Sequence, residues 1–248
     1  IARGLGVAWH AFPRAAAHLA LALEDRARRE GALTLTLDAE IQSLAESKLA
    51  ARVRRFGREI TNGAVVIADV RRGAVLARAG SAGYFSDKAA RRLDHCVTAR
   101  SPGSALKPFT YALAMENQVL YPSERLLDGS VDYGTYAPEN FDGVFNGLVT
   151  AREALAASLN VPAVTLLQRV GPEALLELLR DAGLTTVEHA AAHYGLGLTL
   201  GNAEVRLDEL TAAYGMLANL GAYRPLRVVA DAPAKSRRRL LARGTALA

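Results

Sequence analysis

Two side chains near the middle of the chain have the types and spacing for nucleophilic chemistry. Ser104 and Lys107 occur in the run Ser101-Pro102-Gly103-Ser104-Ala105-Leu106-Lys107-Pro108-Phe109. Pro102-Gly103 predicts a turn, and Pro108 is tolerated only in a first helical turn, so Ser104 begins a helix with Lys107 on the same face. A lysine can take the proton of a serine hydroxyl if burial and nearby positive charge lower its pKa by about three units. The alternative is a capping serine beside an exposed lysine.

A second polar pair, Ser158 and Asn160, lies in Ser158-Leu159-Asn160, directly before Val161-Pro162. The pattern predicts that both side chains project from a junction between two helices. There a hydroxyl can relay a proton and an amide can hold a substrate amide. A helix C-cap followed by a turn before proline is the alternative interpretation.

The elements around these residues indicate an α+β layout. Helical spacing over 15–29 ends at Gly31, and the alternation over Leu33–Leu37 predicts a half-buried strand. Asp38 is a suitable N-cap for a helix that ends at Gly57. Segments 63–70 and 74–79 predict a β-hairpin. Helical apolar spacing recurs over 104–117, 150–158, 161–170, 172–181 and 207–220, whereas 118–147 has no clear period and is expected to be an ordered loop.

Composition excludes several classes of protein. The 248 residues are enough for one large domain or two small ones, and a single cysteine, Cys96, excludes an internal disulfide and a cysteine-cluster metal site. His189 and His193 are four residues apart, but alanines separate them, so we expect no metal. The basic clusters match no nucleic-acid motif, so we expect no nucleic-acid partner.

No apolar run is long enough to cross a membrane. Because the chain begins with Ile1, we expect a fragment whose targeting segment lies upstream.

Together these motifs resemble the transpeptidase domain of penicillin-binding proteins. The likeness extends to Tyr136–Asp142, Val149–Leu155, His193–Leu196 and Gly63–Gly80, and covers roughly residues 13–248. Leu33–Leu44 resembles the linker that follows the glycosyltransferase domain in bifunctional class A enzymes, closest to the one-C type. The resemblance implies the fold of serine β-lactamases and penicillin-binding transpeptidases, an antiparallel sheet with a helical region, here expected to lack its C-terminal strands.

The resemblance also implies a role for each matching residue. Ser104 would be the acylated nucleophile, Lys107 its general base, Ser158 a proton relay and Asn160 a contact for the amide of the donor peptide. The implied reaction is attack on a D-Ala-D-Ala stem peptide, loss of the terminal D-Ala and cross-linking to a neighbouring stem amine. Peptidoglycan stem peptides and β-lactams are the implied partners, with other cell-wall synthesis proteins as further candidates. No cofactor is implied.

One departure from the family pattern bears on activity. The chain contains no Lys-Thr-Gly or Lys-Ser-Gly, and Arg243-Gly244-Thr245 follows Arg224–Arg227 too closely to replace it. We therefore expect an incomplete active site. Residues 1–32 would be a linker remnant that follows an absent glycosyltransferase domain, and 33–248 a partial transpeptidase domain. The expected location is the periplasmic face of the inner membrane, with the membrane anchor outside this chain.

Two other functions stay open at this point. The chain could be a catalytically dead remnant or a module that binds cell-wall proteins. The absence of the family's Lys-Thr-Gly motif favours this interpretation. A hydrolase of the D,D-carboxypeptidase or β-lactamase type would need a base that holds a deacylating water, and no residue is an evident candidate.

Overall fold

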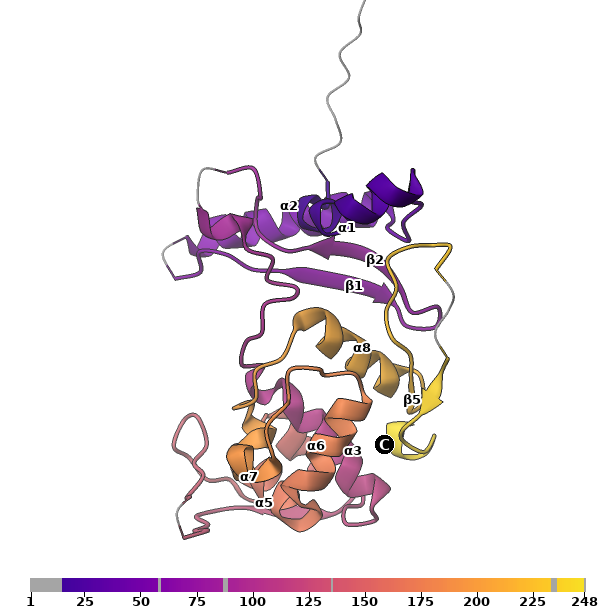
Figure 1. Cartoon of the computed structure of the whole chain (residues 1–248). Coiled ribbons are helices and arrows are strands. Elements are labelled where there is room, and N and C mark those ends of the chain that lie inside the picture. The colour runs from indigo at the N-terminus through magenta and orange to yellow at the C-terminus, as the bar shows by residue number, and fades with distance from the viewer. Residues whose placement is uncertain (1–14, 58, 87–88, 135, 233–235, 248) are drawn as a thin grey trace, which may run out of the picture.

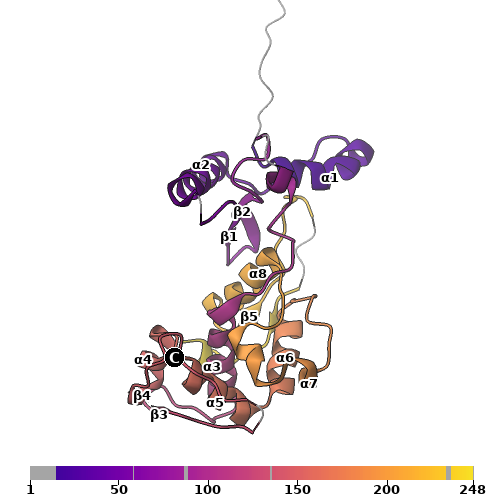
Figure 2. The ribbon, with the colours of Figure 1, turned by 90° about the vertical axis from the view of Figure 1, so that its left-hand side faces the viewer.

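The computed structural model describes residues 15–57, 59–86, 89–134, 136–232 and 236–247, arranged in two parts (Figure 1). The hairpin part, at the top in Figure 1, contains α1 (Ala17–Glu30), α2 (Ala39–Phe56), β1 (Val65–Asp69) and β2 (Ala74–Ala79). The helical part below it contains α3 (Lys107–Glu116), α4 (Ala151–Ala156), α5 (Asn160–Val170), α6 (Pro172–Asp181) and α7 (Ala191–Tyr194). Helix α8 (Leu207–Ala218) lies between the two parts and contacts β1 (Figure 2).

Shorter elements complete the part of the chain that the structure describes. Four 3₁₀ turns are η1 (Ala89–Arg92), η2 (Gly103–Leu106), η3 (Gly195–Leu200) and η4 (Thr245–Leu247). Two further antiparallel pairs are β3 (Arg125–Asp128) with β4 (Gly147–Thr150), and β5 (Ala222–Tyr223) with β6 (Arg238–Arg239). The α+β class expected from the sequence is confirmed. The expected linker over residues 1–32 lies outside the described residues as far as residue 14.

The hairpin part forms as the sequence predicts. Strands β1 and β2 pair in antiparallel register from Val65 with Ala79 to Asp69 with Ala74. The Asp38 side chain caps α2 by accepting hydrogen bonds from the backbone N–H groups of Glu40 and Ile41, both at 3.0 Å. These local signals act within a few residues, and for that reason sequence spacing alone locates them.

The outer edge of β2 is covered by α2 and its cap over Leu76–Arg78, whereas Ala74 at the other end forms a bridge with Arg227. The Gln42 carboxamide accepts a hydrogen bond from the Arg78 N–H at 2.7 Å and donates one to the Arg78 carbonyl at 3.2 Å. The Asp38 N–H donates to the Leu76 carbonyl at 2.9 Å. A helix side chain thus satisfies backbone groups that a neighbouring strand would otherwise pair.

The strand predicted over Leu33–Leu37 is wrong in extent. The segment forms one bridge, Leu35 with Val229, supported by hydrogen bonds from Thr36 N–H to Val228 O and from Ala230 N–H to Thr34 O, both at 2.8 Å. Alternating side chains make a segment compatible with a strand, but a regular ladder also needs a partner of similar length. Here the partner segment pairs only at Val228–Ala230, so no regular ladder forms.

The predicted loop over 118–147 contains strand β3, which the sequence did not indicate. Strand β3 pairs with β4, which begins at the last residue of that segment, and the register runs from Arg125 with Thr150 to Asp128 with Gly147. Each strand has four residues, which is too short for an apolar period to be visible. The chain between β3 and β4 therefore begins and ends at paired residues, Asp128 and Gly147, and this restricts the conformations that the segment can adopt.

Helix α3 is the centre of the helical part. Its Phe109 belongs to one buried cluster and its Tyr111 to a second, so the helix packs on two sides. The first cluster also contains the fully buried leucines of α5, α6 and η3: Leu167, Leu175, Leu179 and Leu198. The second joins Leu126, Ala154, Ala163 and Leu166. The residue that begins α3, Lys107, is therefore fixed by a leucine-rich core.

The single cysteine lies in the connection between the two parts. The Cys96 side chain is fully buried, with Sγ 3.6 Å from the Ala79 carbonyl oxygen. Its own carbonyl accepts a hydrogen bond from the Asp208 N–H at 3.2 Å. Burial raises the pKa of the Cys96 thiol to about 12. Among the residues that the structure describes, no helix is long and apolar enough to cross a membrane.

Candidate active site

The turn that carries Ser104 is held against η3. Gly103 has a φ of 56°, a left-handed conformation that glycine adopts without steric cost. A Cβ atom at Gly201 would lie 2.3 Å from the Gly103 nitrogen. The backbones of Gly103 and Gly201 can therefore approach this closely only because residue 201 has no side chain. The Ser101 hydroxyl donates to the Gly201 carbonyl at 2.6 Å. The Pro-Gly turn is thus locked onto a segment a hundred residues away.

Two further contacts fix the first turns of α3. The Tyr214 hydroxyl of α8 donates a hydrogen bond to the Ala105 carbonyl at 2.7 Å. The buried hydroxyls of Thr110 and Thr199 are 2.7 Å apart and share a hydrogen bond. The helix that begins at Lys107 is therefore held by α8 and η3 as well as by its apolar packing.

Ser104 and Lys107 lie one helical turn apart in very different surroundings. The Lys107 backbone N–H donates to the Ser104 carbonyl, and Ser104 is exposed while the Lys107 side chain is 1% exposed. The Lys107 ammonium donates to the Ser158 carbonyl, to the Ser158 Oγ at 3.2 Å and to the Asn160 Oδ1 at 2.7 Å. All three donors of the amine are used, and within the described part of the chain none reaches the Ser104 hydroxyl.

Burial lowers the pKa of Lys107 from 10.5 to about 8. The cause is desolvation, which penalises the charged form of the amine. In the described ranges no carboxylate forms an ion pair with this ammonium. A lysine with this pKa holds a proton at neutral pH and can release it at modest cost.

Ser158 has an unusual backbone. It lies between α4 and α5 with a φ of 56°, a left-handed conformation that is uncommon for serine. The turn is held by hydrogen bonds from Ser158 N–H to Leu155 O at 3.0 Å and from Leu159 N–H to Ala154 O at 2.9 Å. This turn directs both the carbonyl and the hydroxyl of Ser158 at Lys107. The junction between helices expected from the sequence is confirmed.

The site contains residues to which sequence reasoning gave no role. The Asn160 amide donates to the Glu139 carbonyl at 2.8 Å, and the Asn160 N–H donates to the Asn140 Oδ1 at 2.8 Å. Asn140 donates in turn to the carboxylate of Asp128, which is 0% exposed. The sequence signals were the polar character of the segment and the family resemblance over Tyr136–Asp142, and neither indicated these contacts, because the residues are 12 and 20 positions apart.

The aromatic residues of the 118–147 segment differ in their surroundings. The Tyr133 hydroxyl lies 3.1 Å from the Thr165 hydroxyl, so this ring packs on α5. Phe141 is fully exposed and Phe145 is 41% exposed. The tyrosine therefore packs the segment, while the two phenylalanines face solvent beside Asn140.

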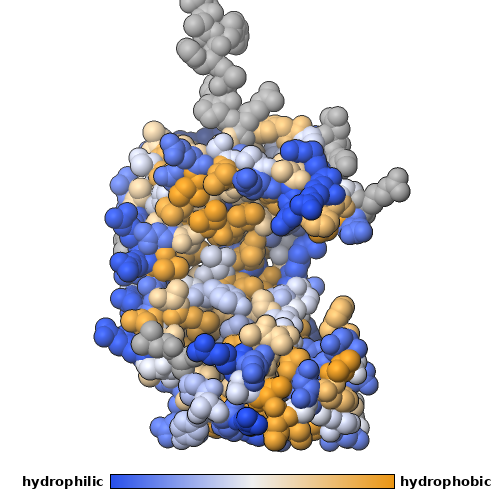
Figure 3. Space-filling view, turned by 180° about the vertical axis from the view of Figure 1, so that it is seen from behind, coloured by the Kyte–Doolittle hydropathy of each residue, from blue (hydrophilic) through white to orange (hydrophobic). Residues whose placement is uncertain are grey.

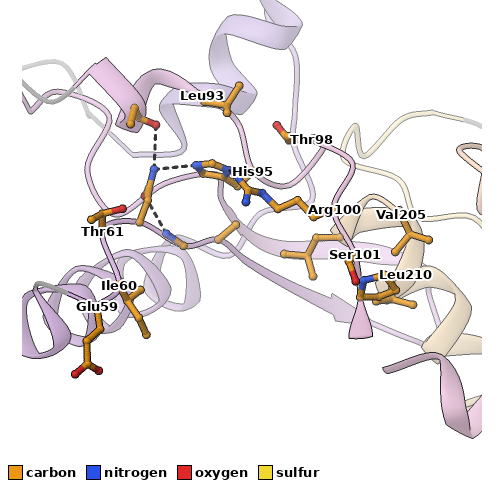
Figure 4. A pocket seen from close by; sticks show the side chains of 16 residues that line it. Glu59, Ile60, Thr61, Leu93, His95, Thr98, Arg100, Ser101, Val205 and Leu210 are labelled. Atoms are coloured by element: carbon orange, nitrogen blue, oxygen red, sulfur yellow. Dashed lines mark hydrogen bonds between the residues drawn. The ribbon is translucent and has the colours of Figure 1, made fainter. Parts of the chain in front are cut away.

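A cavity of about 610 Å³ lies between the two parts of the molecule, and Ser101 and Pro102 of the turn that carries Ser104 form part of its lining. In Figure 4 His95 and Arg100 lie side by side in it, with Arg100 Nη2 3.0 Å from His95 Nδ1. Seen from behind, the surface is indented between the two parts (Figure 3). Ser101 lines this cavity, but Ser104, Lys107, Ser158 and Asn160 do not. The cavity therefore borders the candidate site without containing its polar side chains.

The two histidines noted in the sequence do not share a helix. His189 precedes α7, whereas His193 belongs to it, and their rings lie 4.3 Å apart. Across the described residues no group of three or more histidine, cysteine, aspartate or glutamate side chains could hold a metal ion.

Comparison with known proteins identifies the family. A model of the penicillin-binding protein transpeptidase domain matches residues 63–241. The chain belongs to this family. Penicillin-binding protein 1C of Escherichia coli K12 is 35% identical over 201 residues, which cover 81% of this chain and 26% of the relative. Penicillin-binding protein 1A of Aquifex aeolicus is 36% identical over 165 residues, which cover 64% of this chain and 22% of the relative.

Solved structures support the same fold. The penicillin-binding protein PonA1 of Mycobacterium tuberculosis superposes with a TM-score of 0.75 at 20% identity, and the match covers 94% of this chain and 66% of that one. Penicillin-binding protein 3 of Mycobacterium tuberculosis, in a complex with ampicillin, also gives 0.75 at 23% identity, over 86% of this chain and 55% of that one. The penicillin-binding transpeptidase fold is therefore shown, and the chain spans about a quarter of the curated relatives that it matches.

Proposed function

We propose that the chain carries the Ser104-centred part of the acyl-transfer centre of a peptidoglycan D,D-transpeptidase, without the Lys-Thr-Gly motif that its sequence lacks. Ser104 is the nucleophile, Lys107 takes its proton, Ser158 relays a proton and Asn160 binds the amide of the donor peptide. The observation that carries this proposal is the buried Lys107 amine, which has a pKa of about 8 and is bonded to both Ser158 and Asn160. A structural lysine would gain nothing from such burial, because desolvation destabilises its charged form.

The reaction follows from these positions. Neutral Lys107 accepts the Ser104 proton while Oγ attacks the carbonyl carbon of the penultimate D-Ala. The C–N bond then breaks, and the terminal D-Ala leaves as an amine that takes its proton through Ser158. An amine of a second stem peptide attacks the resulting ester, which forms the cross-link and frees Ser104. In a β-lactam the amide bond of the ring takes the place of the D-Ala-D-Ala bond, and the ester persists.

The position of Lys107 implies a resting state that precedes catalysis. Its three hydrogen bonds go to acceptors, as expected for an ammonium, so one proton must leave before the amine can turn to Ser104. With a pKa of about 8, about a tenth of the molecules are neutral at pH 7. That fraction is sufficient for general-base catalysis.

The setting in the cell is proposed from the relatives alone. Relatives named penicillin-binding protein 1C and 1A support a role in cell-wall synthesis at the periplasmic face of the inner membrane. We propose peptidoglycan stem peptides and β-lactams as partners. The penicillin-binding protein 3 structures in complex with ampicillin and aztreonam support the second of these. We also propose residues 33–248 as the transpeptidase portion and 1–32 as linker.

Intact-protein mass after incubation with benzylpenicillin tests the proposal. The parent is expected to gain the mass of one penicilloyl group, whereas Ser104→Ala, a small change at an exposed position, is expected to gain none. Ser43→Ala, the same change at an exposed position of α2 in the hairpin part, is a matched control that keeps Ser104 and the turn that carries it. An adduct on Ser104→Ala, or none on a parent that melts cooperatively, would overturn the assignment and favour a binding role.

A further inference from the structure

Asp128 is a buried carboxylate without a cation. It ends β3 at 0% exposure, and within the described ranges it forms no ion pair. Its oxygens instead accept four amide contacts. The Asn140 Nδ2 lies 2.8 and 2.9 Å from the two oxygens, and Asn146 donates through its backbone N–H at 2.8 Å and its Nδ2 at 2.7 Å. A buried carboxyl group whose hydrogen bonds all come from amides holds those amides firmly in place.

The carboxylate fixes the orientation of the Asn140 side chain. The Asn140 Nδ2 faces Asp128 and also donates to the Val144 carbonyl at 2.8 Å, so every group on that side is an acceptor. The Asn140 oxygen must therefore point the other way, toward the Asn160 N–H at 2.8 Å. Reversing this amide would place donors against the N–H and an oxygen against the carboxylate.

Asn140 caps helix α5 from a distance. The first N–H groups of a helix lack partners within the helix, and the residue before α5, Leu159, has no polar side chain to offer. The Asn140 oxygen supplies that partner from twenty residues upstream. The adjacent Glu139 carbonyl accepts from the Asn160 Nδ2 at 2.8 Å, which turns the Asn160 Oδ1 toward Lys107.

We infer that Asp128 and Asn140 are positioning residues that hold Asn160, and through it the Lys107 amine, in register with Ser104. These two residues touch neither Ser104 nor Lys107, and they act by orienting Asn160. Burial is what lowers the pKa of Lys107, and Asp128 does not contribute to that shift. The inference rests on the proposed function for its catalytic meaning. Its structural content, the dependence of Lys107 on Asn140, can be measured separately.

The chain offers a matched pair of variants. Asn140→Ala removes the link to Asn160, whereas Asn146→Ala removes one amide bond to the same carboxylate without any contact with Asn160. The Asn146 backbone N–H still donates to Asp128 in that variant. Both changes are Asn to Ala beside one carboxylate, but Asn140 is buried and Asn146 is exposed, so urea unfolding of each variant measures its own loss of stability. Only the first disturbs the candidate site.

Acylation by a fluorescent penicillin gives the first measurement. We expect the second-order rate constant of Asn140→Ala to fall roughly 10- to 100-fold, because misplacing a reacting group by about 1 Å costs up to about 100-fold. Asn146→Ala should stay within about threefold of the parent. An Asn140→Ala rate equal to that of the parent, or an equal loss in both variants, would overturn the inference.

Lysine titration gives a second measurement that needs no activity. The sequence has four lysines, so ¹³C-labelled lysine gives few NMR signals, and Lys107→Arg identifies the one that titrates near pH 8. In Asn140→Ala the ammonium loses a fixed acceptor, so its midpoint should move to lower pH, while Asn146→Ala should leave it unchanged. An unmoved midpoint in Asn140→Ala would contradict the positioning role.

The two measurements separate the proposals. A parent that forms no penicilloyl adduct rejects the proposed function, while the titration still decides the positioning role. If Asn140→Ala does not fold, Asn140→Ser replaces it, because a hydroxyl can both donate to Asp128 and accept from a backbone N–H but is shorter than the carboxamide. Its midpoint should move in the same direction by a smaller amount, and a midpoint equal to that of the parent would contradict the inference.

Discussion

The helical part and the hairpin part are stabilised in different ways. Both apolar clusters found among the described residues lie at or beyond Leu106, and they join α3, α5, α6 and η3 through fully buried leucines. In the hairpin part every residue of β1 is only half-buried, and the buried residues of β2 are mostly alanine and valine. The hairpin depends more on hydrogen bonds such as those between Gln42 and Arg78. The candidate site is built on the part with the deeper core.

The difference appears most clearly in two helices. Spacing predicts an apolar face on α2, yet Leu44 is 55% exposed and Phe56 is 37% exposed. On α3 almost every side chain is buried, including Lys107. Apolar spacing therefore identifies a helix but does not tell how much of its face is covered. Catalytic groups need fixed geometry, and only the second helix provides it.

The largest expected effect is on stability. Leu167→Ala in α5 should lower the free energy of unfolding by about 2–5 kcal/mol, because it leaves a cavity in a fully buried cluster. Leu44→Ala, the same change on α2, should cost less than about 0.5 kcal/mol, because that side chain is exposed. Urea unfolding of both variants measures the difference. Equal losses would remove the distinction between the two parts.

Hydrogen exchange should order the two parts in the same way. Amides of β1 and β2 are expected to exchange through a partial opening of the hairpin part, at a free energy at least about 2 kcal/mol below that for α3 and α5. Mass spectrometry of peptides from each part gives the comparison. Uniform protection across residues 65–79 and 107–116 would mean that the chain opens as one unit.

The pH dependence of acylation should report the helical part alone. In the proposed mechanism the neutral form of Lys107 is the base, so the acylation rate constant should rise about tenfold per pH unit below pH 8 and level off above it. Leu44→Ala should not move this midpoint, since α2 lies in the other part. A profile that is flat between pH 6 and 9 would be inconsistent with Lys107 as the proton acceptor.

The smallest effect concerns the contact between α8 and the turn that carries Ser104. Tyr214→Phe removes the hydrogen bond to the Ala105 carbonyl and should cost about 0.5–1.5 kcal/mol, toward the lower end because Tyr214 is partly exposed. Tyr121→Phe is the control, since Tyr121 is 61% exposed and its hydroxyl makes no hydrogen bond within the described chain. Thermal melts would show whether the two variants differ.

The sequence predicted those features whose causes are local. The Asp38 cap, the 65–79 hairpin and the helix that begins near Ser104 each follow from signals within a few residues. The group formed by Lys107, Ser158 and Asn160 was anticipated from motif resemblance, and the structure brings these three side chains together. Their chemical roles remain predictions.

The features that were missed depend on contacts between distant residues. Asp128 and Asn146 are 18 positions apart, and their bond depends on a pair of four-residue strands too short to show a period. The strand expected at Leu33–Leu37 reduces to a single bridge because its partner near Val229 is short. No pattern within either segment contains information about its partner.

The burial of Cys96 has a practical consequence for labelling. The chain has one cysteine, which is fully enclosed and has a pKa of about 12, so maleimide reagents should leave the folded protein unmodified. A second thiol placed at Phe141, which is fully exposed and adjacent to Asn140, would be the single reactive one. A fluorophore or spin label attached there would report directly on molecules that approach the candidate site.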